Sequence, residues 1–330
     1  MYAVEAVLVA ELRLELVDHV RPLAEQRWLV QRAAPNELVV LDYQLTPIWR
    51  LRLPAGRLGV VAVADDLSLV AVSRGGRVVL LDGSGQQLAS VPGTGFQSSA
   101  GVFTADGAYL WAVSPGRGSE APVTASQELW LIDVATCSMV DRRRIGMFVD
   151  GCQPIRHPDG HMVGLSLWVD RHPAIGWAIC ERGRIDLRLS PWRDRVLTDV
   201  HPAGSEYLSV SREQSFVPGR DDELWRHRLR DDRPVDALAV SAATHLDDAW
   251  DAKSGYLSNE LILASTLDTG WHLLIGTAPM ELLAEVAYPR PIAGSLPLPW
   301  GRDRWLTVGG GRVRGWVLPS PGEQLRLPPT

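Results

Sequence analysis

A chain of 330 residues with 46% hydrophobic residues is long enough to bury a large core, and its formal net charge of −6 at pH 7 argues against nucleic acid or an anionic membrane as the main partner. The three cysteines, Cys137, Cys152 and Cys180, form no C-x-x-C pair, which argues against a disulfide framework and a structural zinc site. No signal-peptide pattern or run of about 18 apolar residues is present, so we expect a cytoplasmic protein.

The N-terminal segment, residues 4–17, has the alternation of a half-buried strand. Leu12, Leu14 and Leu16 are separated by charged residues, which places the leucines on one side of an extended chain. The four-residue spacing of Leu8, Leu12 and Leu16 also fits an amphipathic helix. No capping residue precedes the segment, and this favours the strand.

Strand-like runs then recur in groups, separated by turn residues. The most regular group extends from Ser99 to Ile145 and contains AGVF, AYLWAVS, ELWLID and MVDRRRI. Weaker groups begin near Arg27, Gly59, Cys152, Leu197, His245 and Ser295, the last having only three runs before a proline-rich tail, residues 319–330. Because the groups resemble one another, the pattern is typical of a repeat protein.

The spacing of the turns gives the number of repeats. Turns between the first and second run of a group lie near Gln26, Asp66, Asp106, Asp159, Ala203, Ser254 and Gly301. Successive turns are about 40 to 53 residues apart, which matches the blades of a β-propeller. We therefore predict an all-β fold, a seven-bladed β-propeller of four-stranded antiparallel blades. The last group lacks a fourth strand, so we expect the N-terminal strand to complete it and to make residues 1–330 a single domain.

Two features resemble those of the WD-repeat β-propellers and their bacterial relatives. The first feature is the turn after the first strand, as in TADGAYLWAVS and RHPDGHMVGLS. The second is the aspartate that ends the third strand, as in ELVVLD, RVVLLD and ELWLID. The resemblance covers nearly the whole chain and implies a rigid surface for macromolecular partners. The Gly-His and Trp-Asp dipeptides of that family are missing, so the resemblance assigns no individual functional residue.

Metal and cofactor sites are not indicated. The tetrapeptides HPDG at 157–160 and HPAG at 201–204 lie at equivalent turns, where proline and glycine set the backbone, and we interpret them as structural. No G-x-S-x-G motif, phosphate-binding loop or dinucleotide fingerprint is present. We expect no cofactor and no metal ion.

The thirteen tryptophans allow two interpretations. Seven lie within strand-like runs, where we expect packing between blades: Trp111, Trp130, Trp168, Trp177, Trp225, Trp271 and Trp305. Trp192, Trp250 and Trp300 lie nearer connections and are candidates for exposed platforms that stack on sugars.

The loops between second and third strands give a hypothesis for a binding site. All such loops emerge on one face of a propeller, and those at residues 115–126 and 213–222 are long. We predict that six polar residues help to form a partner site on this face: Arg117, Glu120, Arg171, His172, Arg220 and Asp221. The alternative is that these loops are mobile surface insertions.

The sequence favours a non-enzymatic scaffold or adaptor subunit that binds a protein or peptide. An alternative is a propeller hydrolase or lyase that acts on a small molecule or glycan in the central channel, for which Asp247, Asp248 and Asp251 form the acidic cluster to test. A carbohydrate-binding module is a third possibility. Nucleic acid and membranes are not expected as partners.

Overall fold

The computed structural model of the chain describes residues 2–53, 59–74, 77–92, 100–115, 126–148, 151–168, 173–211, 222–245, 248–292, 297–299, 301 and 303–319. In these residues the chain forms 29 β-strands and one short α-helix, α1 (Val240–Thr244). No helix among them is long and apolar enough to cross a membrane.

The strands form seven sheets, called blades 1 to 7 here. Blade 1 contains β3 (Val17–Leu23), β4 (Arg27–Arg32), β5 (Glu37–Leu41) and β6 (Pro47–Arg52). Blade 2 contains β7 (Gly59–Val63), β8 (Leu69–Arg74), β9 (Arg77–Asp82) and β10 (Gln87–Pro92). Blade 3 contains β11 (Ala100–Phe103), β12 (Tyr109–Pro115), β13 (Ser126–Asp133) and β14 (Ser138–Phe148). Blade 4 contains β15 (Gly151–Arg156), β16 (Met162–Trp168), β17 (Ala174–Glu181) and β18 (Arg184–Arg193).

The remaining blades complete the ring. Blade 5 contains β19 (Arg195–Val200), β20 (Glu206–Ser211), β21 (Glu223–Arg228) and β22 (Arg233–Ala239). Blade 6 contains β23 (Gly255–Tyr256), β24 (Leu261–Ser265), β25 (His272–Gly276), β26 (Leu282–Ala287) and an added strand, β1 (Ala3–Glu5). Blade 7 contains β27 (Pro297–Pro299), β28 (Arg304–Gly309), β29 (Arg312–Val317) and β2 (Val7–Arg13).

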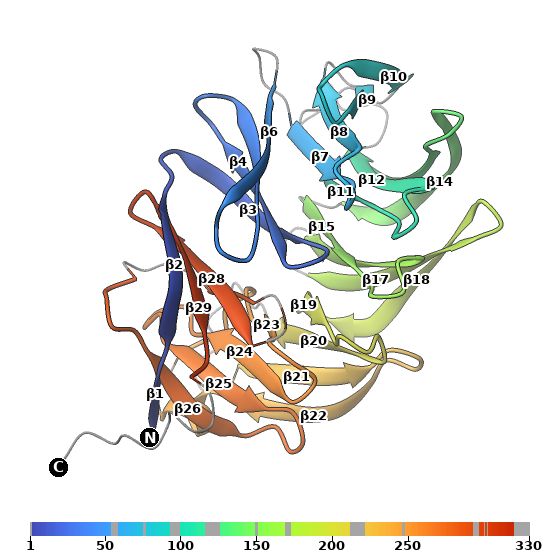
Figure 1. The fold of residues 1–330 in the computed structure, drawn as a ribbon. Helices are drawn as coiled ribbons and strands as arrows, with labels where there is room; N and C mark the ends of the chain where they lie inside the picture. Colours follow the sequence, from blue (N-terminus) through green and yellow to red (C-terminus); the bar gives the residue numbers. More distant parts are fainter. Residues whose placement is uncertain are drawn as a thin grey trace.

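The blades stand around a central axis, as Figure 1 shows. The first strand of a blade lies innermost, and β7, β11, β15, β19, β23 and β27 follow one another along the inside of the ring. The predicted seven-bladed β-propeller of four-stranded antiparallel blades is confirmed.

The packing of blades against one another explains the sequences of the strands. A central strand such as β5 is buried along its whole length, because each of its faces meets another blade. The outer strand β18 instead alternates between exposed and buried residues. Seven clusters of buried apolar residues hold the described parts of the blades together, and each cluster combines two neighbouring blades.

Tryptophans contribute to these cores. Six are almost fully buried: Trp28, Trp111, Trp130, Trp177, Trp305 and Trp316. The expected exposure of Trp250 is wrong, because its indole N–H donates to the Leu238 carbonyl (3.1 Å) and only 3% of the residue is exposed. Trp192 is half-buried with its ring edge to face with Trp225, and Trp300 lies outside the described residues.

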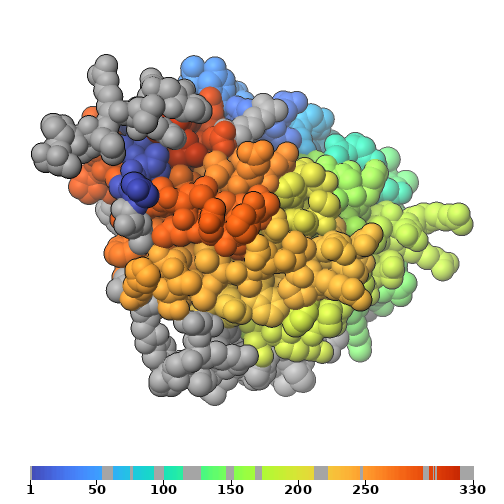
Figure 2. All heavy atoms as spheres, turned by 90° about the horizontal axis from the view of Figure 1, so that it is seen from below, coloured from blue at the N-terminus to red at the C-terminus, as the bar shows by residue number. Residues whose placement is uncertain are grey.

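The N-terminal segment closes the ring. Strand β2 pairs antiparallel with β29, with Leu8 opposite Trp316 and Leu12 opposite Val313. The expected continuous strand over residues 4–17 is wrong in its extent, because the segment is divided. The N–H of Ala6 donates to the Ala287 carbonyl (2.8 Å), and residues 3–5 pair parallel with β26 of blade 6. The N-terminal segment therefore fastens two blades, and in Figure 2 the blue N-terminal residues lie against the orange-red surface.

Candidate functional site

The six residues predicted to bind a partner, Arg117, Glu120, Arg171, His172, Arg220 and Asp221, lie outside the described residues. They belong to the segments that join second and third strands in blades 3, 4 and 5. That site stays a prediction.

The acidic residues proposed for an enzyme have structural roles where they are described. The carboxylate of Asp248 accepts hydrogen bonds from the N–H groups of Asp268 (2.9 Å) and Thr269 (3.1 Å). Burial raises the pKa of Asp248, but these hydrogen bonds outweigh burial and the pKa lies below its usual value. Asp251 accepts the N–H of Lys253 (2.8 Å), and Asp247 lies outside the described residues. The carboxylates of Asp248 and Asp251 therefore order turns.

The aspartates that end third strands also order turns. Asp42 accepts the N–H groups of Gln44 and Thr46, both at 2.8 Å. Asp82 and Asp133 accept N–H groups of the turns that follow them in the same way. The aspartates that resemble those of WD repeats therefore stabilise turns, because their carboxylates accept hydrogen bonds from backbone N–H groups in place of a backbone carbonyl.

The two similar histidine tetrapeptides link successive blades. Nε2 of His157 lies 2.8 Å from the carbonyl oxygen of Gly204, and Nε2 of His201 lies 3.2 Å from that of Asn259. Gly204 has a φ of +73°, and a Cβ there would fall 2.7 Å from the His157 ring. The structural interpretation of HPDG and HPAG is thus supported, and the described residues contain no group of three or more metal-ligating side chains.

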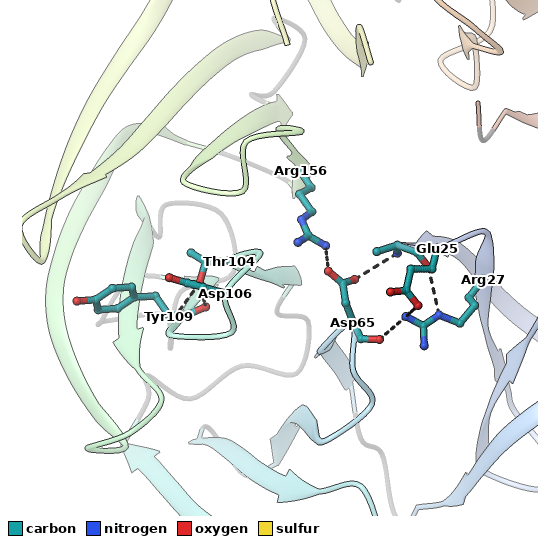
Figure 3. Close-up of polar contacts among 8 residues, drawn as sticks. Glu25, Arg27, Asp65, Thr104, Asp106, Tyr109 and Arg156 are labelled. Carbon is teal, nitrogen blue, oxygen red and sulfur yellow. Dashed lines mark hydrogen bonds and ion pairs between the residues drawn. The ribbon is translucent and has the colours of Figure 1, made fainter. Parts of the chain in front are cut away.

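A network of ion pairs and hydrogen bonds joins three blades at the end where first strands turn into second strands. Asp65, in the turn between β7 and β8, pairs with Arg156 at the end of β15. Its carboxylate also accepts the N–H of Ala24, and its carbonyl accepts a hydrogen bond from Arg27 (2.6 Å). Figure 3 shows Asp65 between Arg156 and Arg27. Because these residues come from blades 2, 4 and 1, the network ties the inner turns together.

A Ser-His pair in blade 5 has the residue types of a nucleophile and its base. Oγ of Ser209 lies 2.8 Å from Nε2 of His227, and both residues are fully buried. Arg195 also donates to Ser209 (2.7 Å), and Tyr207 stacks on His227. Burial, and after it the charge of Arg195, lowers the pKa of His227 to about 3. The pair is a polar part of the core that no substrate reaches.

A groove of about 780 Å³ lies between blades 4 and 5. The pairing of β16, β17 and β18 builds one wall. Ile179 lies between Met162 and Asp186, and Trp177 lies opposite Arg188, so period-two alternation turns all five side chains toward blade 5. This wall is apolar near its centre and charged at its outer strand.

Turns of blade 5 form the other wall. Gly204, Ser205 and Glu206 come from the turn into β20, and Arg228, Leu229 and Arg230 come from the turn between β21 and β22. In an antiparallel blade these two turns lie at one end and the second-to-third loops at the other. The groove therefore lies at the end of the blades where first strands turn into second strands.

Inter-blade hydrogen bonds accompany the groove. The Arg188 guanidinium donates to the carbonyls of Leu229 (2.8 Å) and Arg230 (3.2 Å), and it lies 3.5 Å from the Asp232 carboxylate. The bond between His157 and Gly204 joins the same blades nearer the channel. Arginine and histidine thus hold the two walls at a fixed separation.

The groove exists because the apolar contact between its walls is limited. The buried cluster between blades 4 and 5 contains six residues: Ile175, Trp177, Leu197, Val200, Tyr207 and Leu229. It is the smallest of the seven clusters among the described residues. The sequence alone did not indicate it, because it depends on the spacing between blades.

Comparison with known proteins supports the assignment of the fold. No protein-family model and no curated protein matches the chain. A crystal structure of the β-propeller domain of Cps50 (Swd1) from Myceliophteria thermophila is similar with a TM-score of 0.58 and 12% identity, covering 95% of this chain and 100% of that one. The Dos1 propeller is similar with a TM-score of 0.55 and 14% identity, covering 88% of this chain and 75% of that one. The chain is therefore a β-propeller, and at these identities the likeness establishes the fold alone.

Proposed function

We propose that the chain is a non-enzymatic scaffold or adaptor subunit that binds a protein partner, and that the groove between blades 4 and 5 is its docking site. The composition of the groove carries the proposal. Met162 and Ile179, which are half-buried, form an apolar centre above the buried Trp177 and Leu229, and charged side chains form the rim, as in protein interfaces. Methionine and arginine are also among the residue types enriched at such interfaces.

The size of the groove supports a segment of a partner protein as its occupant. About 780 Å³ lies within the range of pockets that take a ligand of a few hundred daltons, which corresponds to a few side chains of an extended peptide. The proposal retains the cytoplasmic location and the bacterial origin expected from the sequence. The net charge of −6 supports a protein rather than nucleic acid or a membrane as the partner.

The test compares capture by the intact protein with capture by a groove variant. Arg228→Glu with Arg230→Glu reverses two exposed charges on the groove rim. The matched control, Arg50→Glu with Arg52→Glu, reverses two exposed charges on the outer strand of blade 1. Proteins captured from a native lysate are identified by mass spectrometry, and each is then purified and titrated against the three forms by calorimetry.

The proposal requires a partner that binds the wild type and the blade 1 control with similar affinity and the groove variant at least tenfold more weakly. A third variant, Arg117→Glu with Arg220→Glu, tests the loop face predicted from the sequence. If every purified partner loses affinity only in this third variant, docking in the groove is wrong. If no purified partner binds, the scaffold role is wrong as well.

A further inference from the structure

The groove has charges of opposite sign at its two ends. Its inner end, next to the turns between first and second strands, is lined by Asp159 and Glu206 and by no arginine, with His157 Nδ1 2.9 Å from the Asp159 carboxylate. Its outer part, next to the third and fourth strands, is lined by Arg188, Arg228 and Arg230, with Asp186 as the one carboxylate; Arg228 is the cross-strand neighbour of Glu206, and Arg188 and Arg230 lie farther out. The lining residues thus give two negative charges at the inner end and a net charge of +2 at the outer end.

The inner carboxylates are held in place. The Asp159 side chain is 49% exposed, and its carboxylate accepts the N–H groups of His161 (2.9 Å) and Met162 (3.2 Å). Glu206 lies 3.5 Å from Arg226, whose side chain is largely buried and does not line the groove. The inner end therefore presents a fixed negative charge to an occupant.

The outer arginines are positioned by aspartates behind them. Asp231 lies 3.4 Å from Arg228 and 4.0 Å from Arg230, and Asp232 lies 3.5 Å from Arg188. Arg230 is the most exposed of the three, with 78% of its side chain accessible. Since these aspartates do not line the groove, the guanidinium groups face an occupant and their counter-charges do not.

We infer that the groove recognises an extended peptide segment of the partner in one direction, with a basic residue at the inner end, an apolar side chain over Met162 and Ile179, and an acidic residue at the outer end. The inference rests on the proposed function and adds the chemistry of the partner. The groove spans from the second strand to the fourth, a distance of about 10 Å at about 4.8 Å per strand. An extended chain covers this distance in about three residues, so the two charges of the peptide are about three residues apart.

The test uses fluorescein-labelled eight-residue peptides and fluorescence polarisation with the full chain. One set has an apolar residue between a lysine and a glutamate spaced three residues apart, in both chain directions. Control sets carry two lysines, two glutamates or the same residues with the charges adjacent. We expect one direction of the first set to bind, and every control peptide to bind at least tenfold more weakly.

A charge-reversal variant separates an effect on peptide recognition from an effect on folding. Arg230→Glu removes a side chain that makes no hydrogen bond to blade 4 among the described residues, so the propeller stays folded and thermal unfolding verifies this. The variant is expected to lose at least fivefold in affinity for the opposite-charge peptide and to gain affinity for the peptide with two lysines. Arg50→Glu is the control, and both affinities stay within twofold.

The outcomes distinguish this inference from the proposed function. If a groove-dependent partner exists but its binding segment shows no preference for charge order, the polarity is wrong and the docking site stands. If no peptide of any set binds at 1 mM, the inference is also overturned, whatever the lysate experiment gives. Equal loss of all peptides in Arg230→Glu would show an effect on folding or general binding and would contradict the charge assignment.

Discussion

Blade 5 meets its two neighbours in different ways. Toward blade 6 it contributes to a large cluster of buried residues that includes Leu208, Leu224 and Ile262. Toward blade 4 it contributes to the smallest cluster and leaves a groove. Figure 2 shows the yellow and orange surfaces of blades 5 and 6 in continuous contact, whereas the yellow-green β17–β18 hairpin of blade 4 projects from the ring.

The connections between the blades also differ. Only Asp194 separates β18 from β19, at the end of the blades opposite the groove. Residues 240–254 separate β22 from β23, and they include α1, with Val240 and Ala243 buried, and Trp250. The N–H of Trp250 also donates to Asp222 (2.7 Å). A connecting segment thus adds buried residues to the interface between blades 5 and 6, whereas the connection between blades 4 and 5 adds none to theirs.

The largest loss of stability is expected when the ring that contains both interfaces is opened. Deleting residues 1–13 removes β1 and β2, exposes the edge strand β29 and leaves Trp316 without its cross-strand neighbour Leu8. We expect loss of soluble monomer, measured by size-exclusion chromatography with light scattering. A truncated monomer with an unchanged melting temperature would show that closure by β2 is not needed.

Truncation of one side chain at each interface compares the two. Trp250→Ala removes an indole that is 3% exposed and its hydrogen bond to Leu238, and we expect a loss of about 3–5 kcal/mol in the free energy of unfolding. Ile179→Ala at the half-buried groove wall is expected to cost about 1 kcal/mol or less. Urea unfolding measures both. Equal losses would contradict the difference between the interfaces.

The two sides of blade 5 are expected to respond to pH in opposite directions. On the blade 6 side, burial raises the pKa of Asp199 and of Asp222 to about 6 from an ordinary value of 3.8. The folded state therefore holds protons that the unfolded state has lost between pH 4 and 6, and stability falls as pH rises through this range. On the blade 4 side, burial lowers the pKa of His227 to about 3 from 6.5, so stability falls as pH drops below 6.5.

Asp199→Asn separates these contributions. At pH 8 the variant avoids the cost of an ionised buried carboxylate, but its amide keeps only one of the two backbone N–H groups that Asp199 accepts, from Val200 and Tyr256, so we expect its free energy of unfolding to change by about 1 kcal/mol or less there. Between pH 6 and 4 it lacks the compensating gain of the wild type, so its stability falls more steeply as His227 titrates in the unfolded chain. Urea unfolding at several pH values measures both. Parallel pH profiles of the variant and the wild type would contradict the assignment to Asp199.

The smallest effect is expected at the bridge beside the groove. Arg188→Gln removes the hydrogen bonds from the guanidinium to Leu229 and Arg230 on blade 5, and we expect a loss of about 1 kcal/mol because the side chain is 45% exposed. Arg230→Gln, which removes no such bond, is the control and is expected to change stability by less than about 0.5 kcal/mol. If both variants shift the melting temperature equally, Arg188 does not hold the blades together.

Local regularities predicted the fold, whereas the candidate site depends on distances between units. Aspartates such as Asp66 and Asp106 order turns between first and second strands within a few residues of themselves, so the recurrence of these turns is visible in the sequence and gives the blade count. The groove requires Ile179 and Leu229 to lie across a gap whose width is set by packing between two sheets. The division of the N-terminal strand at Ala6 was not predicted either, because its cause is a hydrogen bond to Ala287, which lies far away in the sequence.

The sheet register of the N-terminal segment also sets the order of events during synthesis. Val7 pairs with Val317, so strand β2 is synthesised well before its partner β29. At about 5–20 residues per second this interval is on the order of 15–60 s in a cell. During this interval blades 1 to 6 can form one after another. Strand β2 has no partner at this stage, and its apolar residues are exposed to contact with other chains. Premature release from the ribosome would leave the nascent chain without its last pairing and prone to join another copy.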